Sequence, residues 1–370
     1  MTPPLLFVSG EYPPDIGGVG DYTERLRGGL GGLGWPTRVL SRRQVKHWDA
    51  RALMWLARTA PRTGVVHIQY QAGAYDLLGD VCLMPALLRR IRPRVRVVTT
   101  FHDVRPPFLF PRAGDLRHSA VRLLAGTSLA VVAADARDLD ALAGERDALA
   151  GRSSAFHHVP IGPNVACAPP PGYNRLAFRA GRGLDPQTLA IVYFGLRNAS
   201  KGLDVLLAAF DQVVRQHPRA RLLLVGGEVG ASDPTDRATA DRLRSRLDAD
   251  RVLQTGWLPP DQLSAYLLAA DVALLPYTDG ASPRRGSLLA CAEHGLPIVS
   301  TTPVAPEVAD AVAAVPSDPQ RLGEAVLHVA RDPVAAAHYR AAAHALAARA
   351  SWPAIARAHQ EIYEQLLGAS

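Results

Sequence analysis

Short apolar segments alternate with longer amphipathic ones along almost the whole chain, and this alternation restricts the fold more than any other feature. The apolar segments of the first half are residues 5–9, 37–40, 65–69, 95–101, 129–133 and 156–159. Those of the second half are residues 189–194, 221–225, 252–254, 272–276, 297–300 and 311–315. Apolar segments of this length between helical patterns are typical of parallel strands covered on both faces. The sequence therefore predicts an α/β protein with two Rossmann-like domains.

Two proline-containing segments, residues 160–164 and 169–172, separate the halves. A chain of 370 residues with 48% hydrophobic side chains is long enough to bury two cores. We place the first domain at residues 1–168 and the second at residues 169–350, followed by an amphipathic helix within residues 351–370. In that helix one face carries Ile355, Ala358, Ile362 and Leu366.

The formal net charge of +7 is concentrated in two arginine-rich segments of the first half. Residues 38–62 carry many cations against the single acid Asp49, and residues 89–96 carry arginines and no acid. One interpretation is a solvated arginine-rich surface; the other is a surface that docks on anionic lipid or binds phosphorylated substrates. Nucleic acid is not an expected partner, because no recognised binding module or interleaved aromatic pattern accompanies these arginines.

The expected location of the protein is the cytoplasm. No apolar run reaches the roughly 18 residues of a membrane-spanning helix, and residues 1–8 lack the cationic segment and long apolar core of a secretion signal. Cys82, Cys167 and Cys291 are widely spaced without a CxxC pattern, which favours reduced thiols. Because of the arginine-rich segments, a peripheral position at the inner face of the membrane stays open as an alternative.

Residues 193–202 predict an anion-binding turn. They follow an apolar strand and precede a helix that begins near Leu203. Gly195 allows a ligand to approach the backbone closely, and Arg197 and Lys201 add two positive charges beside the N–H groups of the helix start. Such a turn suits a diphosphate.

A glycine-rich loop follows the first predicted strand. Glycine at positions 17, 18 and 20 lets a ligand lie against bare backbone, and Asp21 with Glu24 resembles a helix N-cap and its box partner. The order Gly-Gly-Val-Gly is not the dinucleotide pattern GxGxxG, and no acid ends the second strand. A dehydrogenase is therefore not expected.

His102 directly follows the predicted strand 95–101, at the edge where parallel sheets bind ligands. It could donate a hydrogen bond to a sugar hydroxyl or orient the reacting centre. The alternative is a histidine that only caps its own loop.

Residues 277–288 form a second candidate loop between a buried strand and a helix that runs to His294. Either Ser282 or Ser287 could cap this helix, and its N-terminus would offer a second anion-binding edge. Of Arg284 and Arg285, we expect one to be exposed to solvent.

No metal site is predicted. The pairs Asp138–Asp140 and Asp248–Asp250 match a metal-binding carboxylate pattern, but they fall in or beside helical, charge-rich stretches. No histidine and cysteine ligand cluster is present in the sequence.

Taken in order, these motifs resemble the family 4 glycosyltransferases, which are retaining enzymes with the two-domain GT-B fold. The resemblance rests on residues 12–14, 17–20, 102, 160–164, 195–202 and 295–299, and it extends over nearly the whole chain. It implies two Rossmann-like domains that face a cleft. The final helix is similar to the one that crosses back to the first domain in that family.

The resemblance also implies roles for residues at matching positions. The co-substrates of such an enzyme would be a nucleoside-diphosphate sugar and an acceptor hydroxyl, without a cofactor. The donor diphosphate would be held by Arg197, Lys201, Gly286, Ser287 and Leu288. The cleft would be lined by Gly17, Gly18, Val19 and Gly20. His102 would be the active-site histidine near the transferred sugar.

One departure concerns two glutamates that the family usually carries eight residues apart, one for the donor sugar and one for the ribose. The matching positions here hold Ser282 and Ala290. Ser282 and Arg285 remain candidate contacts to the donor sugar, whereas Ala290 cannot replace a carboxylate. Loss of a charge-assisted hydrogen bond costs roughly 1.5–3 kcal/mol. We therefore expect altered donor recognition with the diphosphate contacts retained.

Together, the motifs and the resemblance predict a metal-independent glycosyltransferase of the hexosyltransferase type, with the donor on the second domain and the acceptor on the first. The resemblance implies that the anomeric configuration is retained. Two alternatives stay open. One is a catalytically silent nucleotide-sugar-binding protein, suggested by the missing glutamates, and the other is a sugar-nucleotide epimerase. The acceptor class also stays open, with lipid-linked, polysaccharide and small-molecule acceptors all compatible with the basic first domain.

Overall fold

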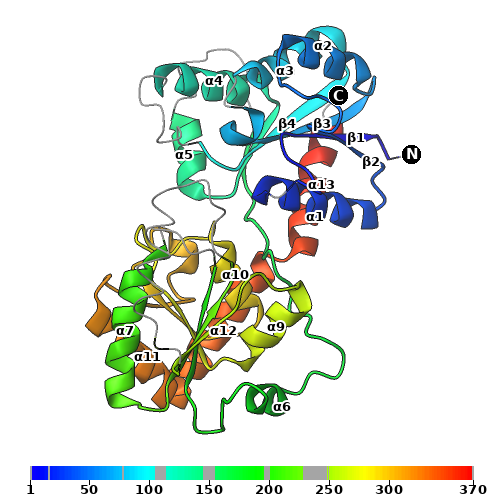
Figure 1. The fold of residues 1–370 in the computed structure, drawn as a ribbon. Coiled ribbons are helices and arrows are strands. Elements are labelled where there is room, and N and C mark those ends of the chain that lie inside the picture. The colour runs from blue at the N-terminus through cyan, green and yellow to red at the C-terminus, as the bar shows by residue number, and fades with distance from the viewer. Residues whose placement is uncertain are drawn as a thin grey trace. The chain divides into compact units, whose positions relative to one another are not determined.

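A computed structural model of the chain describes residues 2–15, 17–76, 79–104, 114–144, 155–195, 201–227, 248 and 250–368. The chain divides into two compact units (Figure 1). The first unit comprises Met1–Ile161 together with Trp352–Ser370, and the second comprises Gly162–Ser351.

The first unit contains a six-stranded parallel sheet in the order β2-β1-β3-β4-β5-β6. Its strands are β1 (Leu5–Ser9), β2 (Thr37–Leu40), β3 (Gly64–Tyr70), β4 (Val95–Phe101), β5 (Ala130–Ala133) and β6 (Ala155–His158). Because all strands are parallel, their carboxyl ends share one edge. The strand order reverses between β1 and β3, which makes that edge a topological switch point.

Helices cover both faces of this sheet (Figure 1). One face carries α1 (Gly18–Gly32) and α13 (Trp352–Gly368). The other carries α2 (Ala50–Thr59), α3 (Met84–Ile91) and α4 (Gly114–Thr127). The connecting segments include the short 3₁₀ helices η1 (Ala72–Tyr75) and η2 (Asp80–Leu83) and the helix α5 (Ala136–Gly144).

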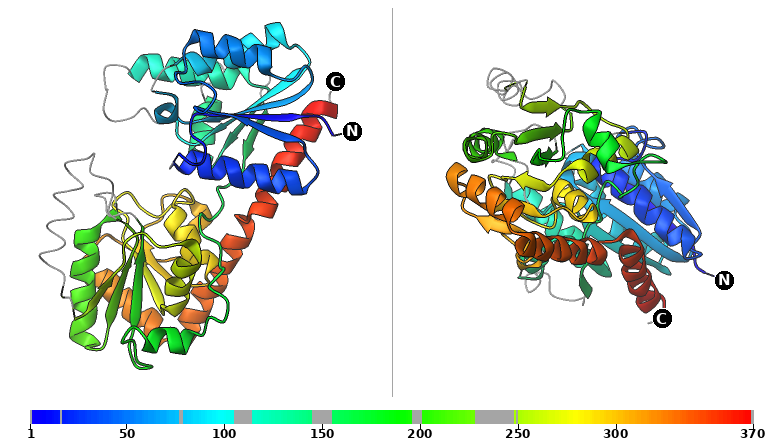
Figure 2. Two further views of the ribbon diagram at one scale, coloured as in Figure 1. Left: turned by 45° about the vertical axis from the view of Figure 1, so that its right-hand side comes forward. Right: turned by 90° about the horizontal axis from the view of Figure 1, so that it is seen from below.

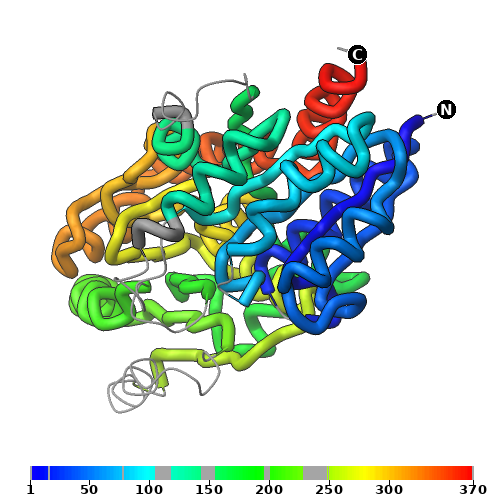
Figure 3. The backbone as a smooth tube through the Cα atoms, turned by 90° about the horizontal axis from the view of Figure 1, so that it is seen from above, coloured from blue at the N-terminus to red at the C-terminus, as the bar shows by residue number. Residues whose placement is uncertain are grey.

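The C-terminal helix α13 belongs to the first unit, as the sequence predicted. Ile355, Ile362 and Tyr363 are buried in one core with Tyr22 and Leu26 of α1. The start and the end of the chain lie close together (Figure 3), and Thr2 and Leu367 line the same surface hollow. A segment distant in sequence therefore completes the core of the first unit.

The second unit repeats the arrangement with the strand order β12-β11-β10-β7-β8-β9, again all parallel. Its strands are β7 (Ala190–Phe194), β8 (Arg221–Val225), β9 (Val252–Gln254), β10 (Val272–Leu275), β11 (Ile298–Thr301) and β12 (Ala313–Val315). Here the switch point lies between β7 and β10.

Helices flank this second sheet on both sides (Figure 2). They are α6 (Arg175–Ala180), α7 (Leu203–Gln216), α9 (Pro260–Ala269), α10 (Gly286–Glu293), α11 (Pro319–Arg331) and α12 (Pro333–Arg349), with a 3₁₀ turn at η6 (Pro306–Val308). Helix α11 packs on α7, and α12 packs on α10.

The predicted strands therefore all form, within two residues of their expected bounds. Cys82, Cys167 and Cys291 make no disulfide. Within the described part of the chain, no helix has the length and apolar character needed to cross a membrane.

Candidate functional site

The two strands at the switch point of the second unit bring two predicted motifs together. Gly195 follows β7 and Tyr277 follows β10, and β7 and β10 are neighbours in the sheet. Arg197 falls outside the described residues, as do all of residues 196–200. The described part of the first motif is therefore Gly195 together with Lys201 and Gly202.

Gly195, the residue after β7, lies close to the first turn of α10. Its φ of 148° lies in the region that glycine adopts easily. A Cβ atom built there would lie 3.8 Å from the Ser287 side chain. The end of β7 and the first turn of α10 are thus in direct proximity, as expected for a ligand-binding crevice at a switch point.

Two cations lie against one buried aromatic ring. Lys201 Nζ is 5.1 Å and Arg285 Cζ is 4.7 Å from the centroid of the Tyr277 ring. Arg285 also forms an ion pair with Asp279. Sequence reasoning missed Tyr277, although its position immediately after β10 was a usable signal. Neither Arg284 nor Arg285 is fully exposed, so the expectation that one of them is solvent-exposed was wrong.

Helix α10 begins without a side-chain cap. Arg285 is the N-cap residue and makes no capping hydrogen bond, so the prediction of a Ser282 or Ser287 cap was wrong. Ser287 Oγ instead forms a 2.7 Å hydrogen bond with the Tyr277 hydroxyl. By position, the N–H groups of Gly286, Ser287 and Leu288 have no intrahelical acceptor. An uncapped helix start beside two cations is a favourable place for an anion.

Burial changes the protonation of Lys201. Desolvation, followed by repulsion from Arg285, lowers the pKa of Lys201 to about 8. An anion bound beside the ammonium group would oppose both effects and raise this pKa. Without a bound ligand, Lys201 is therefore half charged at about pH 8 and loses its charge as the pH rises further.

A testable consequence concerns pH and nucleotide affinity. The affinity for a nucleoside diphosphate should weaken as the pH rises through 8, because free Lys201 then loses its proton. The chain has two lysines, Lys46 and Lys201, so ¹³C-methylated lysine NMR can follow each. One signal should titrate with a midpoint of about 8, disappear in Lys201→Met and shift to higher pH with ligand. Two signals that both titrate above about pH 10 would contradict the prediction.

The two positions without the expected glutamates are both buried. Ser282 lies in the turn before α10, where its carbonyl accepts a hydrogen bond from the Arg285 N–H at 3.1 Å. Ala290 is buried inside α10. Glu293, one helical turn further, interacts with His344 and the backbone of Cys167. It does not replace either glutamate.

In the first unit, the glycine loop begins helix α1 earlier than predicted. Gly17 is the N-cap residue and the helix starts at Gly18, so Asp21 is not the cap. Asp21 N–H donates to the Gly17 carbonyl at 3.1 Å, which places Asp21 inside the first turn. Glu24 pairs with Arg27 instead of closing a capping box. The start of α1, with Gly18, Val19 and Gly20, is thus a second helix N-terminus without a side-chain cap.

His102 lies beside the helix that this loop begins. Its backbone N–H donates to the Tyr70 carbonyl at 2.9 Å, and its ring meets Tyr22 of α1 edge to face, with centroids 4.8 Å apart. Its Nε2 forms a 2.8 Å hydrogen bond with Gln69 Oε1. Because an amide oxygen only accepts, Nε2 carries the proton and is already used. A hydrogen bond from Nε2 to a sugar hydroxyl would therefore have to replace this contact with Gln69.

The charge of His102 is also fixed by its surroundings. Burial, followed by the nearby His359, lowers the pKa of His102 to about 3. The ring is therefore neutral at physiological pH, with Nδ1 as its unprotonated nitrogen.

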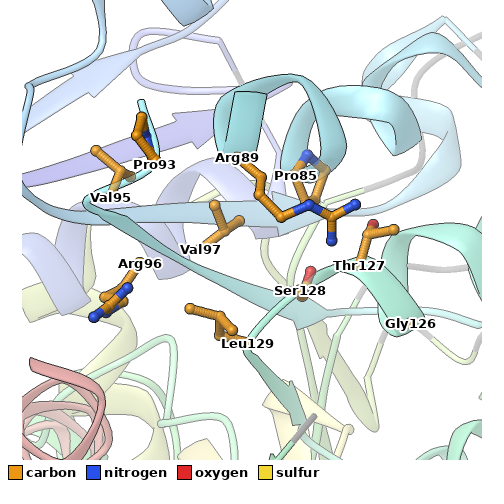
Figure 4. Close-up of a pocket in the computed structure, with 10 residues that line it drawn as sticks. All are labelled: Pro85, Arg89, Pro93, Val95, Arg96, Val97, Gly126, Thr127, Ser128 and Leu129. Atoms are coloured by element: carbon orange, nitrogen blue, oxygen red, sulfur yellow. The ribbon is translucent and has the colours of Figure 1, made fainter. Parts of the chain in front are cut away.

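A hollow of about 90 Å³ lies elsewhere in the first unit (Figure 4). It is lined by residues around the starts of β4 and β5, including Val95, Leu129 and Arg89. Since β4 runs from Val95 to Phe101, this hollow lies at the opposite edge of the sheet from His102. It is not part of the candidate site.

The carboxylate pairs considered for metal binding do not form a ligand cluster. Asp248 forms an ion pair with Arg251 and accepts a 2.9 Å hydrogen bond from the Asp250 N–H. Among the described residues, no three histidine, cysteine, aspartate or glutamate side chains are grouped as metal ligands.

Part of the second unit is similar to a known protein family. Residues 188–332 match the family model described as "Glycosyl transferases group 1". A D-inositol 3-phosphate glycosyltransferase from Segniliparus rotundus is 39% identical over 105 residues, which are 28% of this chain and 23% of that protein. One from Corynebacterium aurimucosum is 32% identical over 111 residues, 29% of this chain and 26% of that protein. The chain thus matches about a quarter of the length of these curated relatives.

Solved structures resemble the whole chain. A sucrose-phosphate synthase from Thermosynechococcus elongatus superposes with a TM-score of 0.72 and 18% identity, over 100% of both chains. The Anabaena protein HepE, solved with UDP and glucose, has a TM-score of 0.70 and 16% identity over 98% of this chain and 99% of its own. The predicted fold of two Rossmann-like units is confirmed over the whole chain, and within the second unit residues 188–332 are similar to group 1 glycosyl transferases.

Proposed function

We propose that this chain, whose residues 188–332 match the group 1 glycosyl transferase model, moves a sugar from a nucleoside-diphosphate sugar to an acceptor hydroxyl with retention of anomeric configuration. The main support is the arrangement at the β7 and β10 switch point, where Lys201 and Arg285 flank the uncapped start of α10. UDP is the first nucleotide to test, because HepE was solved with UDP and with UDP-glucose.

The chemistry follows from the charges at this point. When the bond between sugar and diphosphate breaks, negative charge grows on the departing nucleoside diphosphate. Lys201, Arg197 and the N–H groups at the start of α10 would stabilise that charge in place of a metal ion. The first unit would bind the acceptor, with the glycine loop and His102 near the transferred sugar. Ser282 and Arg285 would contact the donor sugar in place of the missing glutamate.

The experiment combines calorimetry and product analysis. Nucleoside diphosphates are titrated first, and the UDP-sugars are then incubated with and without acceptors. D-inositol 3-phosphate is the first acceptor to test, because it is named for both curated relatives. We expect nucleotide binding, slow donor hydrolysis without acceptor and transfer with one. Failure of every nucleoside diphosphate to bind would overturn the proposal. Binding without hydrolysis or transfer would favour the silent protein, and an isomerised donor would indicate the epimerase.

A finer proposal concerns the acceptor side: the α2 face of the first unit docks on an anionic membrane surface. Helix α2 buries Leu53 and Leu56 but leaves Met54 36% and Trp55 41% exposed. Leu83, in the neighbouring 3₁₀ helix, is 49% exposed. Exposed arginines lie on α2, just after it, and on α3: Arg51, Arg58, Arg62, Arg89 and Arg90. Exposed apolar side chains combined with such cations suit the interface of a bilayer that contains acidic lipids.

Replacing Trp55 by serine should weaken binding to vesicles with acidic phospholipids by about 10-fold, since a side chain of this size contributes about 1.5–3 kcal/mol when buried. Sedimentation with vesicles measures this. The matched control is Trp257→Ser, which removes a 78% exposed tryptophan of the second unit and should leave binding unchanged. Equal binding by Trp55→Ser and the unaltered protein would contradict the docking surface.

A further inference from the structure

Strand β3 carries two polar side chains on one face inside a fully buried segment. His67 and Gln69 alternate with Val66, Ile68 and Tyr70, and neither His67 nor Gln69 has exposed surface. Buried polar groups are costly unless their hydrogen bonds are made. The partners of these two side chains therefore indicate why they are there.

Gln69 connects His102 to this buried row. Its Oε1 accepts from His102 Nε2 at 2.8 Å, and its Nε2 lies 3.3 Å from His67 Nε2. An amide NH₂ only donates, so His67 Nε2 is an acceptor and the His67 proton is on Nδ1. That proton is donated to the Tyr363 hydroxyl of α13, with a 2.6 Å separation. Thr100 adds a second donor to His67 Nε2 at 2.7 Å.

The orientation of the Gln69 amide sets the direction of the hydrogen bonds that join His102, Gln69 and His67. If His102 carried its proton on Nδ1 instead, its unprotonated Nε2 would face the Gln69 Oε1. Two hydrogen-bond acceptors would then be in contact with no proton between them. Gln69 cannot rotate its amide to accommodate this without presenting its oxygen to His67 Nε2. The amide of Gln69 thus couples the tautomers of two histidines.

Four titratable side chains around His102 and His67 are uncharged at neutral pH. Burial lowers the pKa of His67, and burial lowers the pKa of His359 on α13 to about 4. Burial raises the pKa of Tyr22 on α1 and of Tyr363 on α13. Asp103 follows His102 in the chain. With His67, His359, Tyr22 and Tyr363 all neutral, hydrogen bonding through Gln69 decides which ring nitrogen of His102 is protonated.

We propose that Gln69 is a positioning residue for the glycosyl transfer: its side-chain carbonyl keeps the His102 proton on Nε2 and leaves Nδ1 as the hydrogen-bond acceptor for a hydroxyl of the bound sugar. The catalytic consequence rests on the proposed function. The tautomer itself does not depend on it. In this proposal the sugar hydroxyl donates a hydrogen bond to Nδ1 of His102.

Two substitutions separate positioning from packing. Gln69→Met keeps the length and approximate volume of the side chain and removes both hydrogen bonds. Gln69→Glu keeps an acceptor for His102 Nε2 and adds a negative charge, which favours the doubly protonated His102. ¹⁵N-histidine NMR reads the tautomer and charge of His102, assigned with His102→Phe, and steady-state kinetics with a UDP-sugar give kcat, KM and their pH dependence.

In the unaltered protein the NMR spectrum should show His102 protonated at Nε2 alone across the neutral range. Gln69→Met should lose this single tautomer and lower kcat by about 10- to 100-fold, while calorimetry gives an unchanged affinity for UDP. Gln69→Glu should retain the Nε2 proton and acquire an acid limb, with activity recovering as the pH rises and Nδ1 loses its proton.

His102 protonated at Nδ1 in the unaltered protein would overturn the proposal even if the chain proved to have no transferase activity. So would a single Nε2 tautomer that persists in Gln69→Met. In an active enzyme, parallel losses in both variants at every pH would also overturn it, because they would indicate packing alone.

Discussion

Replacing Lys201 by methionine should lower kcat/KM for a nucleoside-diphosphate sugar by about 100- to 1000-fold, the usual effect of losing one donor that stabilises transition-state charge. Methionine keeps an apolar stem against the Tyr277 ring, where Lys201 Nζ now lies 5.1 Å from the centroid. The loss would therefore report the missing ammonium charge. Steady-state kinetics with the donor varied, together with calorimetric titration of the nucleoside diphosphate, measure it.

The chain offers a matched control for this substitution. Lys46, its only other lysine, is exposed in the first unit, and Lys46→Met should leave kcat/KM within about twofold. A substitution of Arg197 by alanine should resemble Lys201→Met in kinetics, since both residues are assigned to the same diphosphate. If Lys201→Met turned over at a near-normal rate, the assignment of the diphosphate to this turn would be wrong.

Replacing Gly202 by alanine should destabilise the second unit by about 3 kcal/mol, the sum of backbone strain and steric overlap. Gly202 is the N-cap residue of α7 with φ of 64°, a left-handed conformation that costs an alanine roughly 1–2 kcal/mol. A Cβ atom there would also overlap the carbonyl oxygen of Pro276, a backbone atom that cannot simply turn away. Thermal unfolding should show a decrease in Tm of about 6–10 °C.

Gly183→Ala separates the two causes. Gly183, also in the second unit, has a similar φ of 69°, and no described atom lies within 4 Å of its added Cβ. It should therefore show the strain alone, with a decrease in Tm of about 2–4 °C. Equal decreases for the two variants would show that the overlap with Pro276 contributes nothing.

The strands were predictable because their signal is local and strong. A strand buried on both faces favours a continuous apolar run, and segments such as β7 and β10 meet this requirement closely. The carboxyl-edge positions of Gly195 and His102 followed from the strands without further information, since parallel strands end at one edge.

Helix starts were less predictable, because a serine or aspartate near the right position is an incomplete signal. Ser287 is diverted from capping by its hydrogen bond to Tyr277, a residue that reaches it only through the fold. The sequence favoured Asp21 as the N-cap, yet the N-cap of helix α1 is Gly17, four residues earlier, and the helix starts on glycines that no propensity scale would select.

The least predictable residues act through partners distant in sequence. The interaction of Gln69 with His102 spans 33 positions, and that of His67 with Tyr363 spans 296. A usable trace was nevertheless present. Two polar residues at alternate positions of an otherwise apolar, buried strand are unusual, and they indicate a hydrogen-bonded row on one face of the sheet.

The contribution of α13 to the first unit has a consequence for biosynthesis. Residues of the first sheet leave the ribosome early, yet Ile355, Ile362 and Tyr363 of its core are translated only after the whole second unit. The second unit, by contrast, is one continuous stretch of chain and can finish packing beforehand. We therefore expect the first unit to mature after the second, with its apolar α1 surface available to chaperones until residues 352–368 have been translated.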